Sequence, residues 1–280
     1  MDHVETGTFA PLRNGAEQPQ SIRVVSWNVN RGCNLQEIIE YLERADGDVL
    51  LLQEIDKNAR RSGYRNIAKE IAQKLRMNYV FGCEFEELSQ GTPTSPTHHG
   101  QATLSRWPLS HARVLRFRNQ SGFWHPRWFI PPLSVFQRRL GGRMALVCEA
   151  LINDVRLVTY NLHLESRGND ELRLQQLSQV LEDARQFGEH VPALIAGDFN
   201  FDLRNSAVAK LLSGAQFENP FQSGAWSPIT AYTRFGRARS IDFILTRDLP
   251  FTRDASVARV ARASDHFPLT LTLQMDTATL

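Results

Sequence analysis

The chain has 280 residues, of which 42% are hydrophobic and 22% are charged, and its formal net charge is +2. This composition allows a sizeable hydrophobic core and argues against global disorder. The length fits one large domain or two small ones. The small net charge does not by itself indicate a protein that binds nucleic acid.

Cysteine use and the start of the chain bear on localisation. Cys33, Cys83 and Cys148 include no C-x-x-C pair, which favours reduced thiols in a cytoplasmic protein over a disulfide framework. Residues 1–20 lack the apolar core of a signal peptide and are interpreted as a mobile tail. No segment reaches the apolar length of a membrane span. We therefore expect a soluble, cytoplasmic protein.

The predicted elements form one domain over residues 21–275. A strand opens it, and a helix follows Asn34, with Glu37 completing a capping-box-like pattern. In chain order, later strands are expected at 48–54, 78–85, 100–107, 109–117, 143–152, 155–164, 192–200, 240–246, 256–262 and 267–274. Helices are expected near 67–75, 169–188 and 206–212. The strands at 100–107 and 109–117 are predicted to pair as a hairpin broken at Pro108. Strands in hairpin-like pairs favour an α+β protein with helices covering a two-sheet core.

Polar side chains recur at the ends of these otherwise apolar strands. In "PALIAGDFN", alternation places Asp198 and Asn200 on one face and Phe199 on the other. Each such residue has an ordinary explanation as a turn, a cap or a surface ion pair. Burying many ionisable groups costs free energy unless they converge on partners or a cation, so we expect a common site. The residues concerned are Asn28, Glu54, His163, Asp198, Asn200, Asp242, Asp265 and His266.

The metal-binding part of this site is predicted from its ligand atoms. Glu54, Asp265 and Asn28 offer hard oxygen ligands, which suit Mg²⁺ or Mn²⁺ better than zinc. The sequence has no Cys/His cluster with zinc spacing. The pair His98–His99 lies in a loop rich in Pro, Thr and Gly and is interpreted as solvated.

The remaining residues fit attack by water on a phosphate ester. Asp198 would orient or deprotonate the water, and Asn200 would hold the phosphate or that water. His163 and His266 would donate hydrogen bonds to phosphoryl oxygens, on which negative charge builds in the transition state. Asp242 or Asp265 would fix the orientation of a histidine.

The motifs "SWNVN", "LLQE", "NLHLES", "GDFN", "SIDFIL" and "SDH" occur in this order over nearly the whole chain. In this order they resemble the endonuclease/exonuclease/phosphatase superfamily, the fold of pancreatic DNase. The resemblance implies a four-layer α/β/β/α sandwich, with two mixed, mainly antiparallel sheets packed face to face and helices outside. It also implies a divalent-metal phosphodiesterase or phosphatase site at one edge, with Asn28 and Glu54 near the metal.

The same resemblance implies roles for the other matched residues. Asp198 corresponds to the water-orienting Asp and Asn200 to the phosphate-binding Asn. His266 belongs to the terminal Asp-His pair, Asp242 to the buried acid that orients it, and His163 to the second histidine of DNase-like members. Tyr160 stands where some AP endonucleases have a catalytic tyrosine, but alternation places it opposite His163, so we leave it out of the site.

The subfamily is open at this point. "SIDFIL" lacks the Trp-Arg of many AP endonucleases and the Trp-Cys-Asp-Arg pattern of inositol polyphosphate phosphatases. "HLESRGNDELRLQQL" is locally similar to tyrosyl-DNA phosphodiesterases, although a helix start after "HLES" would look much the same.

The segment 116–143 contains six arginines and no acid, interleaved with aromatic residues. Arginine with aromatics suits phosphate contacts and base stacking, and it would equally suit a membrane interface. A strand pair with core aromatics and solvated arginines is the third interpretation. Within this segment, Trp124, Arg127 and Trp128 are the candidate substrate-binding residues.

We therefore expect a Mg²⁺- or Mn²⁺-dependent phosphodiesterase that acts on a nucleic acid. One alternative is a phospholipid or sphingomyelin-type phosphodiesterase, in which the loop at 124–129 would contact membrane lipid. Another is a non-catalytic binding module on the same fold. The sequence indicates no protein partner, and it leaves endo- or exonucleolytic action and the number of metal ions open.

Overall fold

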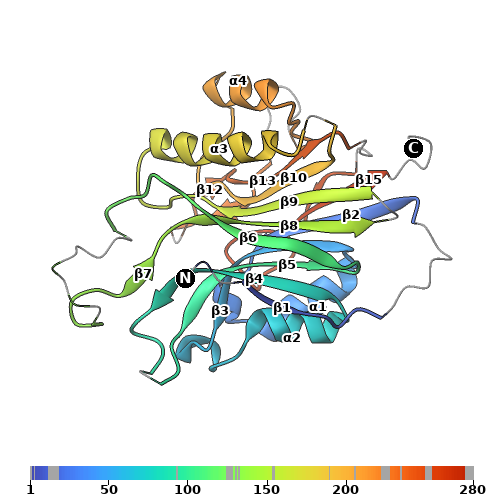
Figure 1. Ribbon diagram of the computed structural model, residues 1–280. Helices are drawn as coiled ribbons and strands as arrows, with labels where there is room; N and C mark the ends of the chain where they lie inside the picture. The colour runs from blue at the N-terminus through green and yellow to red at the C-terminus, as the bar shows by residue number, and fades with distance from the viewer. Residues whose placement is uncertain are drawn as a thin grey trace.

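Two β-sheets pack face to face, and helices cover their outer faces (Figure 1). In that view α3 (Asp170–Arg185) and α4 (Ser206–Gly214) lie above one sheet, and α1 (Leu35–Ala45) and α2 (Ile67–Leu75) lie below the other. The predicted four-layer α/β/β/α sandwich is confirmed. The computed structural model describes residues 2, 4–11, 19–92, 94–123, 129, 131, 133–152, 155–188, 190–204, 206–221, 228–233, 235–249 and 254–274.

The two sheets are mixed and mainly antiparallel, as predicted. Among the pairings described, only β2 with β3 and β9 with β10 are parallel. The eight-stranded sheet has the order β1 (Val4–Gly7), β4 (Asn78–Glu87), β5 (His98–Ser105), β3 (Val49–Lys57), β2 (Ser21–Asn28), β15 (Leu269–Gln274) and β14 (Ser256–Val257), with β7 (Arg139–Gly141) beside β4. The five-stranded sheet has the order β13 (Asp242–Arg247), β10 (Ala193–Asp198), β9 (Val155–His163), β8 (Met144–Ile152) and β6 (Leu109–Arg116), and β11 (Ala231–Tyr232) pairs with β12 (Ala238–Arg239).

Apolar side chains fill all three interfaces between the layers. One cluster lies between α1, α2 and the eight-stranded sheet, one between α3, α4 and the five-stranded sheet, and one between the sheets. Helix α1 buries Leu35, Ile38 and Leu42 on one face, which is the spacing of an amphipathic helix. Helix α3 begins after Asn169, whose side chain accepts a hydrogen bond from Leu172 N at 3.0 Å.

Two local predictions are wrong, and in both cases a tertiary contact is the reason. The strands on either side of Pro108 do not form a hairpin, because β5 and β6 belong to different sheets. Trp107 is buried between the sheets, and its carbonyl accepts a hydrogen bond from Asn78 Nδ2 at 3.0 Å. Asn34 does not cap α1 with its side chain, because its amide donates to Ala263 O at 2.9 Å.

The prediction of a mobile tail over residues 1–20 is wrong for Val4–Gly7. These residues form β1, an edge strand that pairs antiparallel with β4. Glu5 secures the strand by accepting hydrogen bonds from Asn66 Nδ2 at 2.7 Å, from the Tyr79 hydroxyl at 2.6 Å and from Lys57 Nζ. These contacts lie far from Glu5 in the sequence, so local composition did not reveal them.

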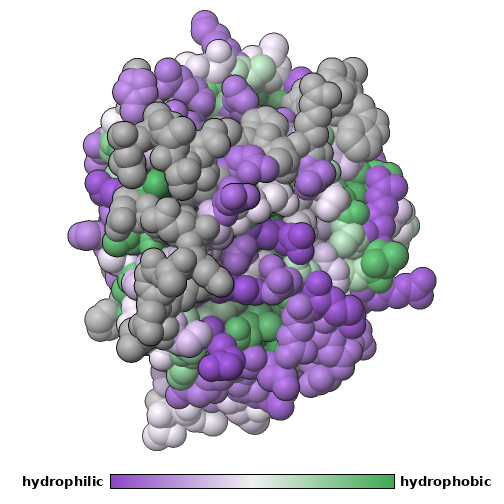
Figure 2. Space-filling model, turned by 90° about the vertical axis from the view of Figure 1, so that its right-hand side faces the viewer, coloured by the Kyte–Doolittle hydropathy of each residue, from purple (hydrophilic) through white to green (hydrophobic). Residues whose placement is uncertain are grey.

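The helices and the described surface were compared with what a membrane-spanning protein requires. No helix in the described part of the chain is long and apolar enough to cross a membrane. Figure 2 shows the face on the right-hand side of Figure 1, where the described residues are mostly hydrophilic and hydrophobic side chains form small separate areas. Cys33, Cys83 and Cys148 are all free thiols, with Cys33 exposed and the other two buried.

We expect Glu5→Gln to destabilise the fold in a pH-dependent way. Burial raises the pKa of Glu5, but its hydrogen bonds from Lys57, Tyr79 and Asn66 outweigh this effect and lower it. The stabilisation is therefore present above the unfolded pKa of about 4.3 and is lost as the pH falls through the lower folded value. The free energy of unfolding should fall by about 1 kcal/mol at neutral pH.

Urea unfolding of wild type and Glu5→Gln at neutral pH and in acid measures this difference. The difference should shrink in acid, where Glu5 is protonated in the wild type. Glu43→Gln, at an exposed position of α1, is the matched control and should change little at either pH. An equal loss for Glu5→Gln at both pH values would contradict the role of the carboxylate.

Candidate active site

Three polar residues lie side by side at one edge of the five-stranded sheet. In the strand register Asp198 of β10 is paired with His163 of β9 and with Asp242 of β13. Gly197 makes this close approach possible, because its φ is +143° and a Cβ there would lie 1.9 Å from Leu162 O. The glycine before Asp198 is thus required by the packing of β10 against β9.

The turn after β10 holds Asp198 in place. Phe199 points into the core, where it is fully buried against Phe243. Asn200 adopts a left-handed conformation with φ of +56°, and its backbone N donates to Asp198 Oδ1 at 2.9 Å. The Asn200 side chain donates to Leu164 O at 3.2 Å. Asp198 and Asn200 therefore lie next to each other at the end of β10.

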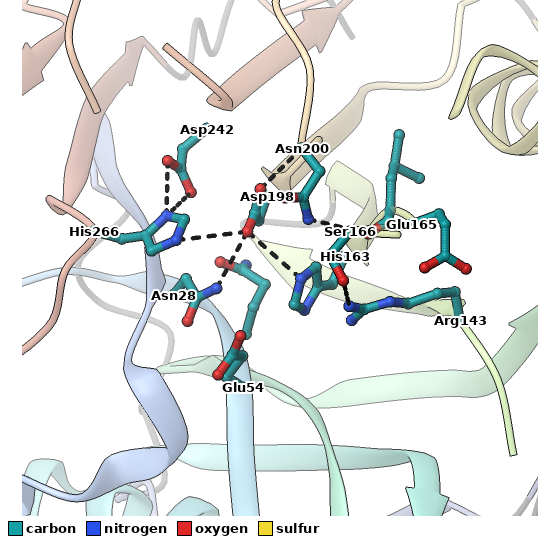
Figure 3. A network of polar contacts seen from close by, with 12 residues as sticks. Asn28, Glu54, Arg143, His163, Glu165, Ser166, Asp198, Asn200, Asp242 and His266 are labelled. Carbon is teal, nitrogen blue, oxygen red and sulfur yellow. Dashed lines mark hydrogen bonds and ion pairs between the residues drawn. The ribbon is translucent and has the colours of Figure 1, made fainter. Parts of the chain in front are cut away.

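Asp198 is the centre of the group of polar residues shown in Figure 3. Its Oδ2 accepts a hydrogen bond from Asn28 Nδ2 at 3.3 Å. The same oxygen lies 3.5 Å from His163 Nε2 and 3.7 Å from His266 Nε2. Burial raises the pKa of Asp198 to about 7, although the charge of His266 lowers it. A carboxyl group with such a pKa can accept a proton near neutral pH.

Asp242 orients His266. The His266 Nδ1 atom lies 2.9 and 3.0 Å from the two carboxylate oxygens of Asp242, and Thr230 Oγ1 donates to Asp242 Oδ2 at 2.7 Å. Burial opposes a charge on the ring, but the carboxylates of Asp242 and Asp198 raise the pKa of His266 to about 10. The ring is therefore an imidazolium at neutral pH, and its Nε2–H faces Asp198.

His163 is neutral, in contrast to His266. Burial, followed by the positive charge of Arg143, lowers the pKa of His163 well below its usual value, so this ring is neutral. Its Nδ1 forms no hydrogen bond within the described structure and lies 4.0 Å from Glu84 Oε2. The site thus combines a charged and a neutral histidine on two sides of one carboxylate.

Glu54 enters the site through a β-bulge. Gln53 and Glu54 of β3 together oppose Gln101 of β5, and Glu54 has a left-handed φ of +53°. Bulges redirect side chains next to functional sites. Asn28 ends the neighbouring strand β2, so both residues lie at the same edge of the eight-stranded sheet.

The Glu54 carboxylate fits a divalent cation. Within the described structure it accepts no hydrogen bond, and the one cationic group within 4.0 Å is Arg31 Nε at 3.9 Å. Its side chain is 21% exposed. Burial raises the pKa of Glu54, but nearby charges, chiefly those of His99 and Arg31, lower it overall. An ionised carboxylate without hydrogen-bond donors is a suitable hard ligand for Mg²⁺ or Mn²⁺.

Asp198, Asp242 and His266 form a second possible metal group, with ligand atoms within 4.8 Å of one another. The geometry disfavours a metal there, because both oxygens of Asp242 already contact the His266 ring.

Asp265, the remaining predicted metal ligand, directly precedes His266 in the chain. Asp265 is exposed, and its carboxylate contacts the hydroxyl of Ser264 at 3.4 Å; its role as a metal ligand stays a prediction. Trp124, Arg127 and Trp128 lie outside the described residues.

Three residues that were not predicted from the sequence as part of the site lie beside His163. They are Arg143, Glu84 and Ser166. The buried Arg143 donates to Glu84 Oε1 at 2.5 Å and to Ser166 Oγ at 2.8 Å. Ser166 is the last residue of the "HLES" motif, and Glu84 interrupts the apolar strand "NYVFGCEF". A polar residue at each of these two positions could have indicated a role in the site, but nothing in the sequence connects either of them to Arg143.

The arginine-rich segment is not a free basic surface. Of its five described arginines, four form ion pairs: Arg116 with Asp2, Arg118 with Glu182, Arg139 with Glu87 and Arg143 with Glu84. The fifth, Arg138, is exposed and forms no ion pair within the described structure. Its described aromatic residues lie both in the core and on the surface: Phe117 is buried, whereas Phe123 and Phe136 are exposed. The segment therefore gives less support for nucleic-acid binding than its composition suggested.

Comparison with known proteins agrees with this geometry. Residues 25–266 match the Endonuclease/Exonuclease/phosphatase family. The chain belongs to this family. The predicted superfamily is thus confirmed, and the protein is a hydrolase of phosphoric ester bonds. No curated protein gives a significant match to the chain.

Solved structures with a similar fold include other members of the family. An endonuclease/exonuclease/phosphatase from Beutenbergia cavernae has 17% identity and a TM-score of 0.65, over 93% of this chain and 73% of that one. The human Nocturnin catalytic domain has 16% identity and a TM-score of 0.67, over 98% of both chains. A D. rerio TDP2 humanized by 14 mutations has 18% identity and a TM-score of 0.63, over 92% of this chain and all of that one.

We expect Asp198→Asn to abolish most of the activity while leaving the fold intact. The amide keeps the size of the side chain but cannot accept a proton, so kcat should fall by roughly 10²- to 10⁴-fold. Turnover of bis(p-nitrophenyl) phosphate measures this loss, and circular dichroism checks folding. Asp202→Asn, which removes a surface partner of Arg204, should keep wild-type turnover. Unchanged kcat in folded Asp198→Asn would exclude Asp198 as the proton acceptor.

Proposed function

We propose that the protein is a divalent-metal-dependent phosphodiesterase whose substrate is a nucleic acid. The observation that carries the proposal is the placement of Asp198, a buried carboxylate with a pKa of about 7 that lies within 3.7 Å of Asn28, His163 and His266. This arrangement places a proton acceptor and hydrogen-bond donors for an anionic group next to one another.

The residues of the chain divide the steps of hydrolysis among themselves. Asp198, held by the Asn200 backbone, accepts a proton from the attacking water. His266 donates from its charged Nε2–H to a phosphoryl oxygen, and Asp242 keeps the ring in this orientation. Neutral His163 can donate one further hydrogen bond to the same group. Charge-assisted donors placed in this way stabilise the negative charge that develops in the transition state.

Glu54, with Asn28 and Asp265 nearby in the fold, would hold the cation. A bound Mg²⁺ or Mn²⁺ would withdraw charge from the phosphate group. The Glu54 carboxylate accepts no hydrogen bond within the described structure, and its cationic neighbour Arg31 lies 3.9 Å away, which supports this assignment. The contacts of both Asp242 oxygens with His266 argue against the Asp198–Asp242–His266 group.

Glu54→Gln should weaken metal binding while preserving the fold. The neutral amide is a poorer ligand, so the Mg²⁺ concentration that gives half-maximal activity should rise by at least the roughly 10- to 100-fold that loss of a supporting group costs. Thermal stabilisation by Mn²⁺ should be lost in parallel, which provides a readout independent of activity. Glu171→Gln, at an exposed position of α3, is the control. Equal metal responses of Glu54→Gln and wild type would place the cation elsewhere.

The choice of nucleic acid rests on aromatic side chains at the rim. Phe123 is 48% exposed, and the guanidinium of Arg167, next to Ser166, lies 4.4 Å from its ring centroid. Phe235, 94% exposed, lies between β11 and β12, in the segment whose Thr230 contacts Asp242. Exposed aromatic rings beside a phosphate site suit base stacking. ANGEL2, which has a similar fold, was solved as a 2′,3′-cyclic phosphatase in complex with adenosine-2′,3′-vanadate.

A lipid substrate is the second candidate, because four further hydrophobic residues in one segment are exposed. They are Phe129, Leu133, Val135 and Phe136. Such a surface would also suit contact with the acyl region of a membrane. A panel of abasic DNA, single- and double-stranded DNA, RNA, 5′-tyrosyl DNA, inositol phosphates and sphingomyelin vesicles discriminates between the two candidates.

For a nucleic acid, Phe235→Ala and Phe123→Ala should each raise the KM for a single-stranded oligonucleotide. Loss of one stacked base costs about 1–3 kcal/mol, which corresponds to roughly 5- to 160-fold in KM. Turnover of bis(p-nitrophenyl) phosphate, which has no base, should stay unchanged. Leu151→Ala, at an exposed position of β8, serves as the control. Turnover of sphingomyelin vesicles without turnover of any oligonucleotide would contradict the nucleic-acid substrate.

A further inference from the structure

A second Asp–His pair lies near the site, on the neighbouring strands β3 and β5. Asp56 and His99 are directly opposite each other in the antiparallel register, and His99 Nδ1 lies 2.7 Å from Asp56 Oδ1. His99 is only 3% exposed, and Asp56 is fully buried. The interpretation of the His98–His99 pair as solvated is therefore wrong for His99.

The surrounding residues hold this ring in one orientation. Arg61 binds both oxygens of Asp56, at 2.7 and 2.8 Å. The Phe85 ring stacks on His99 with centroids 4.6 Å apart, and the guanidinium of Arg139 lies 4.8 Å from the Phe85 centroid on β4. An imidazole that is fixed by a carboxylate and an aromatic ring is well prepared to present its remaining nitrogen.

That remaining nitrogen, Nε2, is directed toward the active site by the pleat of β5. Gln101 lies two residues after His99, and its side chain donates to Met144 O in the other sheet at 3.1 Å. His99 has the same parity and so lies on the same face. Its Nε2 forms no hydrogen bond within the described structure, and its ring is farther than 4.0 Å from Glu54. Among side chains, His99 contributes most to lowering the pKa of Glu54, which burial raises.

The order of strands places His99 opposite His266. The eight-stranded sheet contains the run β5-β3-β2-β15. At one edge of this run lie His99 on β5, Glu54 on β3, Asn28 on β2 and His266 just before β15. Two histidines, each held by an aspartate, therefore flank the residues that would bind the cation.

We propose that His99 is a further substrate-binding residue, which donates from Nε2 to a phosphoryl oxygen on the side of Glu54 while Asp56 holds Nδ1. His266 with Asp242 has the same arrangement on the other side. The inference rests on the proposed function, because it assigns an additional contact to the same phosphate group. Arg61 already supplies two hydrogen bonds to Asp56, so support of that carboxylate does not by itself explain a buried histidine beside it.

Two substitutions at His99 separate this role from a structural one. The amide nitrogen of Gln reaches roughly the position of Nε2, whereas that of Asn reaches roughly the position of Nδ1. His99→Asn should therefore raise the Kd of inorganic phosphate, measured by calorimetry with Mg²⁺ present, by about 10-fold or more, the effect of one hydrogen bond to a charged group. His99→Gln should lose less phosphate affinity than His99→Asn, although it loses the Asp56 contact and has the lower Tm.

His98→Gln is the matched control, because His98 is the adjacent residue and points to the other face of the strand; it should bind phosphate like the wild type. A Kd for phosphate that is unchanged in both His99 variants would overturn the inference, as would a loss of affinity that follows the loss of Tm. If neither variant folds, the ¹⁵N resonance of His99 Nε2 in the wild type decides: it should shift when phosphate binds, and an unchanged resonance would overturn the inference.

The two proposals fail in different ways. A wild-type protein that binds phosphate but hydrolyses none of the phosphate esters in the panel contradicts the proposed function. A hydrolytic wild type whose phosphate affinity is unaffected by changes at His99 contradicts only the role of His99.

Discussion

The hydrogen bond from Asn28 to Asp198 joins the two sheets at the active site, and the rest of the site depends on it. Asn28 ends β2 in one sheet and Asp198 ends β10 in the other, so they meet only when the sheets are aligned along their strands. Deeper between the sheets, Gln53 Nε2 donates to Asn161 Oδ1 at 2.8 Å, and Asn161 Nδ2 donates to Leu52 O at 3.1 Å. Buried polar groups are costly when unpaired, so these contacts favour a single alignment. The sandwich core supplies the stability, and this thin polar layer determines where the two edges meet.

The neighbours of each histidine determine what it can do. His163 and His266 lie at similar distances from the same Asp198 oxygen, yet one is neutral and the other charged. The difference arises because Arg143 lies beside the first ring, whereas two carboxylates lie beside the second. A charged donor next to Asp198 lowers its pKa and offsets part of the effect of burial. The pKa of Asp198 therefore stays at about 7, so its carboxyl group can both lose and accept a proton in neutral solution.

Much of this architecture follows from alternation along the strands. Alternation placed Phe199 in the core and Tyr160 away from His163, and the Tyr160 hydroxyl indeed donates to Asp183 Oδ2 at 2.7 Å on the outer face of the sheet. Strands in hairpin-like pairs predicted the two-sheet core, and the order of the site motifs indicated the superfamily. Alternation does not predict contacts between residues that are distant in the chain. Arg143 and the Glu84 carboxylate are 59 residues apart, and no local pattern connects them.

Two β-bulges that alternation does not predict lie on either side of one glycine. Gly100 of β5 pairs with Ile55 of β3 and with Cys83 of β4, and the register shifts beside it on both sides. The residues added by these bulges include Glu54 and Glu84, and both acids face the site. A Cβ at Gly100 would lie 1.9 Å from Gly82 O, so only glycine lets the strands approach closely enough. Gly197 next to Asp198 has the same function in the other sheet. His99-Gly100 is therefore the counterpart of Gly197-Asp198. In each sheet a glycine allows strands to approach closely beside a polar residue of the site.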